Sequence, residues 1–217
     1  MNTNIAVKSP KNRILPTNGD VFYPTEERKK MGETDFHFRQ VTLLFGMLEL
    51  FFEAREDVYF ASDLMFYYEE GNANKRFAPD LMVCFGISNK KRRSYKLWEE
   101  KVTPSVIIEV ALEATWEKDV TTKRRLFEKL GVAEYYVIDP EYKYLPQPLL
   151  AYRLEFGELV RLAVENNRVF SEKLNLEIVN TGEDFRFFDV EKDEFIPTVN
   201  EITALKAEIE RLKKLIK

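Results

Sequence analysis

The feature that most constrains the fold is a strand–helix–strand pattern over residues 106–139. Residues 106–110 form a short apolar run, and residues 116–130 repeat apolar side chains at helical spacing. Gly131 then marks the end of the helix, and a second apolar run covers residues 135–138. A helix of this length between two short apolar strands predicts a crossover between parallel strands in a buried sheet.

Charged residues interrupt both parts of this pattern. Glu109 lies inside the first apolar run, where a carboxylate is costly unless a partner compensates it. Lys123 lies on the apolar stripe of the helix, between Val120 and Phe127, so we expect its side chain to point toward the sheet. Asp119 precedes Lys123 by four residues and is a candidate ion-pair partner on the same face.

A second carboxylate comes from an upstream strand predicted over residues 77–86, which the chain enters through Pro79. Asp80, Glu109 and Lys123 together are the constellation of a magnesium-dependent phosphodiesterase. The two carboxylates would hold Mg²⁺ or Mn²⁺, and the lysine would orient or activate water and offset phosphate charge. The alternative is a purely structural buried ion-pair network of the same residues.

Two accessory residues stand at the start of a helix predicted over residues 35–53. His37 begins the apolar stripe of this helix, and Glu33 lies one turn before it. They form either a helix-start cluster at the margin of the core or the rim of the acidic site, as a metal or phosphate contact. Asp119 is a third accessory candidate.

The densest basic run is Lys90, Lys91, Arg92 and Arg93, in a predicted loop. It is either a solvated connection or a contact to the phosphate backbone of DNA. The net charge of −4 argues neither for nor against nucleic acid, so any DNA-binding surface must be local.

The rest of the chain predicts mostly strands. We expect a strand over 57–68, a hairpin of 149–155 with 158–164, and further strands over 174–179 and 185–190. A last helix over 200–217 carries a heptad-like seam of Ile202, Leu205, Ile209, Leu212 and Ile216. Little more than two heptads are marginal alone, so this helix must pack on the body or on a second copy.

Composition excludes several classes of protein. The single cysteine, Cys84, cannot form an intramolecular disulfide, and one cysteine with one histidine cannot make a zinc motif. No apolar run approaches about 20 residues, and no signal-peptide pattern is visible, so we expect a cytoplasmic protein without a membrane span. We expect an N-terminal arm over 1–32, one domain over 33–199 and the C-terminal helix over 200–217.

Several of these motifs occur together in a known order. Pro79-Asp80, then Glu109 in PSVIIEV, then Asp119 with Lys123, then GVAEYYVIDP resemble the Uma2 family of restriction-endonuclease-like proteins. That family is part of the PD-(D/E)XK nuclease superfamily, and the resemblance covers about residues 33–189.

The resemblance implies an α/β (α+β) fold with a restriction-endonuclease-like core, a mixed β-sheet flanked by helices, here with the added C-terminal helix. Asp80 matches the motif aspartate and Glu109 the second acid. Ala111 stands where the superfamily pattern has its lysine, and Lys123 fits the helix position from which this family takes the basic residue. The implied activity is a Mg²⁺-dependent endonuclease acting on DNA.

The alternative function is a nuclease-fold module that has lost catalysis and binds nucleic acid or protein. Ala111-Leu112 stands where relatives carry a small hydroxyl residue, which motivates this alternative. A homodimer, through a domain surface or the helix over 201–217, is compatible with both functions.

Overall fold

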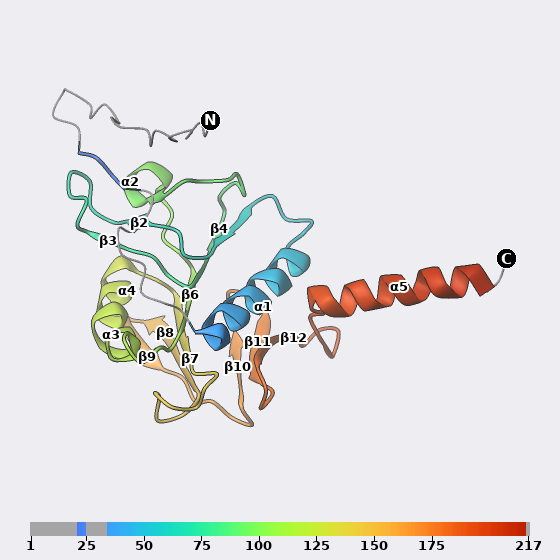
Figure 1. Ribbon diagram of the computed structural model, residues 1–217. Helices are drawn as coiled ribbons and strands as arrows, with labels where there is room; N and C mark the ends of the chain where they lie inside the picture. The colour runs from blue at the N-terminus through green and yellow to red at the C-terminus, as the bar shows by residue number, and fades with distance from the viewer. Residues whose placement is uncertain (1–20, 25–33, 216–217) are drawn as a thin grey trace, which may run out of the picture.

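The computed structural model describes residues 21–24 and 34–215 (Figure 1). Most of the expected N-terminal arm, and Glu33, lie outside the described residues. The helices are α1 (Asp35–Phe51), α2 (Leu97–Glu100), α3 (Trp116–Lys118), the π-helical turn η1 (Asp119–Lys123), α4 (Arg124–Leu130) and α5 (Val199–Leu215).

The structure also contains thirteen strands within the described residues. They are β1 (Val58–Ala61), β2 (Phe66–Tyr67), β3 (Arg76–Phe77), β4 (Leu81–Phe85), β5 (Tyr95–Lys96), β6 (Val106–Val110), β7 (Glu134–Ile138), β8 (Leu149–Glu155), β9 (Glu158–Arg161), β10 (Arg168–Ser171), β11 (Leu176–Asn180), β12 (Phe185–Asp189) and β13 (Glu194–Phe195).

The central sheet has six strands in the order β1-β4-β6-β7-β8-β9. Its pairs are antiparallel except β6 and β7, which run parallel and are joined through α3, η1 and α4. The predicted crossover is therefore confirmed, and so is the mixed sheet flanked by helices. Gly131 ends α4 with a φ of 77°, a conformation that favours glycine.

Helix α1 and the four-stranded sheet β10-β11-β12-β13 cover one face of the central sheet. Thr34 begins α1 as its N-cap, where its side chain accepts a hydrogen bond from the His37 amide at 3.2 Å. Leu44 and Leu48 of α1 are buried in the same cluster as Ile108 of β6. This packing anchors the first turn of α1 beside the ends of β4 and β6.

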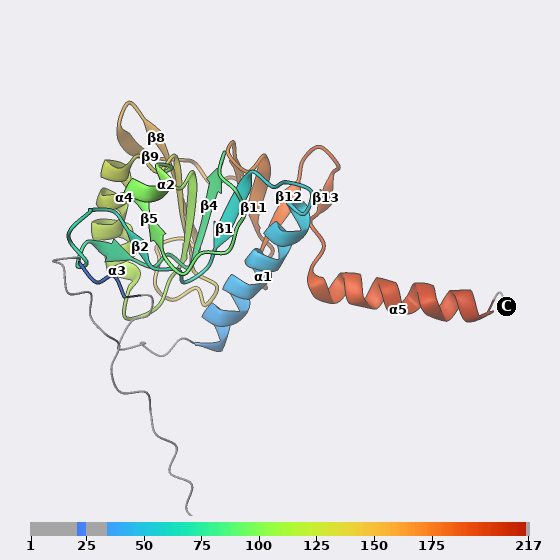
Figure 2. The ribbon, with the colours of Figure 1, turned by 90° about the horizontal axis from the view of Figure 1, so that it is seen from above.

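The crossover segment and the three-stranded sheet β3-β2-β5 cover the opposite face. Figure 2 shows α3 and α4 on one side of the central sheet and α1 on the other. Side chains alternate along β6, so Ile107 lies with Phe127 of α4 while its neighbours face α1. Glu109 shares the face of Ile107 by the same alternation and therefore faces the crossover.

The crossover helix differs from the continuous helix expected over 116–130. Its middle, Asp119–Lys123, is π-helical, with α3 before it and α4 after it. A single π turn widens the helix locally and is common at functional sites. Apolar periodicity alone could not reveal it, because the same residues fit an unbroken α-helix.

The expected strand over 57–68 was wrong in its extent. The chain leaves the central sheet after β1, turns at Asp63 with a φ of 48°, and enters the small sheet as β2. The expected strand over 77–86 is likewise divided into β3 and β4 on either side of Pro79. Each segment is apolar along its whole length because one half is buried in the central sheet and the other half in the three-stranded sheet.

Smaller differences lie in the second half of the chain. The hairpin β8–β9 forms as expected, but its second strand ends at Arg161. β10 and β13 were not predicted, and the segment after the basic run forms β5 and α2 rather than loop alone. Within the part of the chain that the structure describes, no helix has the length and apolar character needed to cross a membrane.

Candidate functional site

Glu109 and Lys123 meet between β6 and the crossover helix. Lys123 Nζ lies 3.0 Å from Glu109 Oε1 and 2.8 Å from Asp119 Oδ1. The carboxylate side chains of Glu109 and Asp119 are 2% and 1% exposed, whereas the Lys123 side chain is 24% exposed. The ammonium therefore lies at the boundary between two buried carboxylates and solvent.

Asp80 joins this group from the entrance to β4. Its Oδ2 accepts a hydrogen bond of 2.8 Å from the backbone N–H of Val110, and its own backbone N–H lies 3.5 Å from Glu109 Oε2. The antiparallel pairing of β4 with β6, with Leu81 opposite Ile108, sets this position. Two carboxylates from neighbouring strands thus share one corner of the sheet.

His37 reaches the same corner from the first turn of α1. Its Nε2 lies 3.1 Å from Asp80 Oδ1, and its side chain is 6% exposed. The Thr34 cap determines where α1 begins and so which residue of the first turn faces Asp80. Of the two accessory residues predicted near the start of α1, His37 contacts the acidic group and Glu33 lies outside the described residues.

The carboxylates of the site have opposite pKa shifts. Burial would raise the pKa of Asp80, but the hydrogen bond and charge of His37, with the Val110 amide, hold it below its ordinary value. Burial raises the pKa of Glu109 well above its ordinary value, against the opposing effect of Lys123. Burial likewise raises the pKa of Asp119, and Lys123 opposes it.

Burial by itself would lower the pKa of Lys123, but the neighbouring Glu109 and Asp119 outweigh burial and raise it. Lys123 is therefore an ammonium ion at neutral pH. Asp119 is the first residue of the π turn. Its backbone carbonyl accepts a hydrogen bond of 3.0 Å from the Tyr135 hydroxyl of β7, which fixes the position of Asp119.

The donor set of this corner suits a hard divalent cation. Asp80 and Glu109 offer carboxylate oxygens, and the group carries more carboxylates than ammonium ions. Among the residues that the structure describes, no cluster of three or more His, Cys, Asp or Glu side chains is arranged to hold a metal. Mg²⁺ is commonly held by one or two carboxylates with water and substrate phosphate, so two carboxylates fit its ordinary mode of binding.

The basic run divides into two kinds of residue. The Arg92 guanidinium is engaged by Glu100 through hydrogen bonds of 2.7 and 3.0 Å and lies 4.1 Å from the centroid of the Tyr59 ring. Its side chain is 3% exposed, and its guanidinium is already engaged within the protein, although Arg92 also lines the groove described below. Lys90, Lys91 and Arg93 are exposed.

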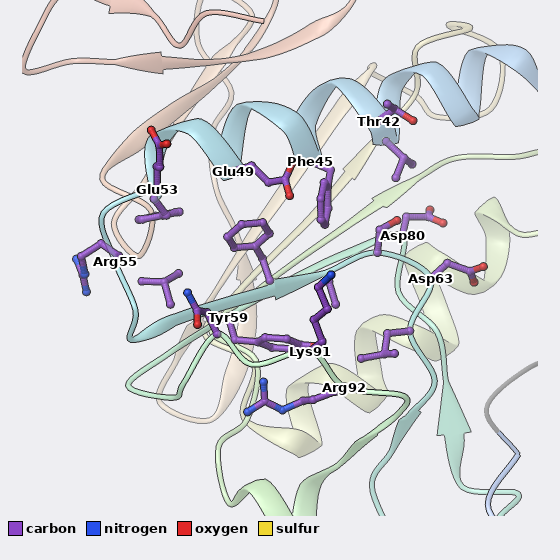
Figure 3. Close-up of a pocket in the computed structure, with 18 of the residues that line it drawn as sticks. Thr42, Phe45, Glu49, Glu53, Arg55, Tyr59, Asp63, Asp80, Lys91 and Arg92 are labelled. Atoms are coloured by element: carbon purple, nitrogen blue, oxygen red, sulfur yellow. The ribbon is translucent and has the colours of Figure 1, made fainter. Parts of the chain in front are cut away.

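A groove of about 820 Å³ runs between α1 and β1 and ends at the acidic corner. His37 and Asp80 line one end, and Lys91 lines it as well. Figure 3 shows Phe45 of α1 pointing toward β1, where its ring centroid lies 5.3 Å from that of Phe60, while Tyr59 lies on the other side of the strand. Of the acidic corner, His37 and Asp80 therefore line this groove, whereas Glu109 and Lys123 do not.

Sequence reasoning missed three participants in this site. The Val110 donor is a backbone N–H, so no residue type could indicate it. The aromatic residues that line the groove have the same spacing in sequence as residues of the hydrophobic core. Tyr135 pairs with Ile107 and so lies on the face that Glu109 shares. The sequence of β7 does not reveal this register, because all five of its residues are buried.

Comparisons with known proteins place the chain in a family. The model of the family Uma2, described as "Putative restriction endonuclease", matches residues 22–179. A crystal structure described as "a putative nuclease belonging to DUF820" from Anabaena variabilis ATCC 29413 is 14% identical, covers 67% of this chain and 76% of its own, and has a TM-score of 0.45. No curated protein matches the chain. Because the family model spans most of its length, the chain belongs to the Uma2 family of "Putative restriction endonuclease" proteins.

Proposed function

We propose that this protein is a divalent-metal-dependent endonuclease that hydrolyses phosphodiester bonds of DNA at the Asp80–Glu109–Lys123 corner. The observation that carries the proposal is the contact of 3.0 Å between Lys123 Nζ and Glu109 Oε1, with Asp80 on the adjacent strand. Two acids and an ammonium from three separate segments suit phosphoryl chemistry, which needs a cation site beside a positive charge.

Each residue has a distinct role in this proposal. Asp80 and Glu109 would hold Mg²⁺ or Mn²⁺, and His37 and the Val110 amide keep Asp80 ionised and ready to bind. When bound, the cation would polarise the phosphate and lower the pKa of a water molecule. Because its pKa is raised, Lys123 would act as a charge that offsets the phosphate and orients water, rather than as a base.

The DNA backbone would lie along the groove between α1 and β1. Lys91 lines the same groove as Asp80, and Lys90 and Arg93 are exposed beside it. Basic side chains in this loop would hold flanking phosphates without reading sequence.

Plasmid cleavage tests the proposal. Purified protein with Mg²⁺ or Mn²⁺ should nick supercoiled DNA, and Asp80→Asn should abolish nicking while the fold is retained. Asp193→Asn is the matched control, because Asp193 is exposed in the turn between β12 and β13, away from the groove, and asparagine tolerates its φ of 56°. Equal cutting by the wild type and by Asp80→Asn would assign the activity to a contaminant and refute the proposal.

A catalytically inactive binding module remains the second candidate. The observation that favours it is the contact of Lys123 with both Glu109 and Asp119, because a purely structural ion-pair network of buried residues would have the same geometry. Calorimetry separates the two functions. Mn²⁺ binding that disappears in Glu109→Ala favours the enzyme, whereas absence of Mn²⁺ binding in the wild type favours the module.

A further inference from the structure

Helix α5 leaves the body of the molecule, and its apolar side chains face solvent. Figures 1 and 2 both show it extending away from the sheets, with only its first turn near α1. There, Val199 Cγ2 would lie 3.2 Å from a Cβ added at Gly46. Farther along the helix, Leu205, Ile209 and Leu212 are 61%, 50% and 45% exposed. The body therefore does not cover the apolar seam.

The seam has the pattern of a two-stranded coiled coil. Ile202, Leu205, Ile209 and Leu212 alternate at spacings of three and four, which places isoleucine at the a positions and leucine at the d positions. In coiled coils, β-branched residues at a with leucine at d favour parallel dimers over trimers and tetramers. The identity of the seam residues thus indicates the number of strands.

The flanking charges indicate both the partner and its direction. Glu201 and Glu208 occupy g positions, and Lys206 and Lys213 occupy e positions. In a parallel pair of identical helices, each g residue faces the e residue five positions later on the other strand, which gives Glu against Lys throughout. An antiparallel pair would place Glu against Glu and Lys against Lys. The helix is therefore complementary to a parallel copy of itself.

We propose that α5 binds α5 of a second copy of this chain as a parallel two-stranded coiled coil. The apolar seams pack against each other, and Glu208 pairs with the partner's Lys213. Glu201 contributes less, because within its own chain it already accepts from the Thr198 amide at 2.7 Å and from Arg186 at 2.8 Å. The proposal does not depend on nuclease activity.

The existing contacts of α5 leave room for this pairing. Glu208 pairs with Arg211 and Lys213 with Glu210 along the exposed helix, and exposed pairs of this kind contribute little and exchange easily. Beside the first half of the seam, a groove of about 660 Å³ is lined by Phe195, Leu205 and Glu208 among others. The side of the seam next to β13 is therefore open rather than filled by side chains of the body.

Sedimentation equilibrium of the full chain is the first test. The wild type should dimerise reversibly, and the measurements should extend to about 0.5 mM, because a two-heptad interface is short. Ile209→Glu places a charge in the seam and should raise the dimer Kd at least about a hundredfold. Ala207→Glu is the matched control: it makes the same change of charge on the outer face and should leave the Kd within about threefold.

Charge reversal tests the pairing across the interface. Lys213→Glu sets glutamate against Glu208 in both symmetric pairs and should raise the dimer Kd about tenfold at low salt. Adding Glu208→Lys in the same chain restores opposite charges and should restore the wild-type Kd. A wild-type Kd for Lys213→Glu would overturn the proposed pairing.

Cross-linking tests the direction of the helices. Leu212→Cys should form an intermolecular disulfide on mild oxidation, because identical seam positions lie together only in a parallel pair. Lys214→Cys, on the outer face, should react far more slowly, and the native Cys84 is buried. A monomer at every concentration overturns the proposal, and so does a dimer that survives Ile209→Glu or fails to cross-link through Leu212→Cys.

Discussion

The most informative single substitution is Lys123→Met, which keeps the length of the side chain and removes its charge. The ammonium lies 3.0 Å from Glu109 Oε1 and 2.8 Å from Asp119 Oδ1, and both carboxylates are almost fully buried. Removing one partner of a buried pair costs about 3–5 kcal/mol, because the remaining charge stays buried without compensation. Since Lys123 is 24% exposed, solvent screens part of this effect, and we expect a loss of about 3 kcal/mol at pH 8.

The loss should depend on pH with a definite sign. Burial raises the pKa of Glu109 and of Asp119, and Lys123 is the first opposing influence on each. Without Lys123 both pKa values rise further, so the folded variant binds protons that its unfolded chain releases. The free energy of unfolding of the variant should then recover as pH falls below 8, by about 1.4 kcal/mol per pH unit for each proton taken up.

Urea unfolding at pH 8 and pH 6, in the presence of a chelator, measures both quantities. Lys118→Met is the matched control, because Lys118 is exposed one position before Asp119, and its loss should stay within about 0.5 kcal/mol. A loss below about 1 kcal/mol for Lys123→Met at pH 8, or one that does not change with pH, would mean that the ammonium does not compensate the buried carboxylates.

Other substitutions test how the fold supports this site. Gln40→Ala should lower the free energy of unfolding by about 2 kcal/mol, because the buried amide exchanges two hydrogen bonds of 2.9 Å with the Phe185 backbone and so ties α1 to β12. Glu134→Ala should cost about 3 kcal/mol, since this buried carboxylate accepts from the Ser171 hydroxyl and from a backbone amide at 2.9 Å. Gly131→Ala should cost about 1 kcal/mol through its φ of 77°. Urea titration measures each value, and losses under about 0.5 kcal/mol would contradict the contacts assigned here.

The parts of the site that could be predicted depend on short-range periodicity. The position of Glu109 in an apolar strand and of Lys123 on the apolar stripe of a helix follows from spacings of two and of three to four residues. Pro79 likewise marked the entrance to β4, beside which Asp80 lies. These patterns predict that the three residues lie near one another at one end of the sheet.

Other features depend on partners far away in the chain. Arg92 is one of four basic neighbours in sequence, and its contacts with Glu100 and Tyr59 distinguish it from the exposed Lys91. The strand expected over 57–68 was divided because its two halves pair with different strands, which local β-propensity cannot report. The groove between α1 and β1 exists only through their packing.

The amino-acid sequence by itself determined the crossover, the burial of Glu109, the inward direction of Lys123 and the heptad pattern of the last helix, because these follow from the repeat of the backbone and the cost of exposing apolar surface. Only the tertiary structure decided that His37 lies against Asp80, that the helix opens into a π turn, and that the seam of α5 is left uncovered. These outcomes depend on which distant surfaces meet, and the periodicity of a single segment carries no information about its partner.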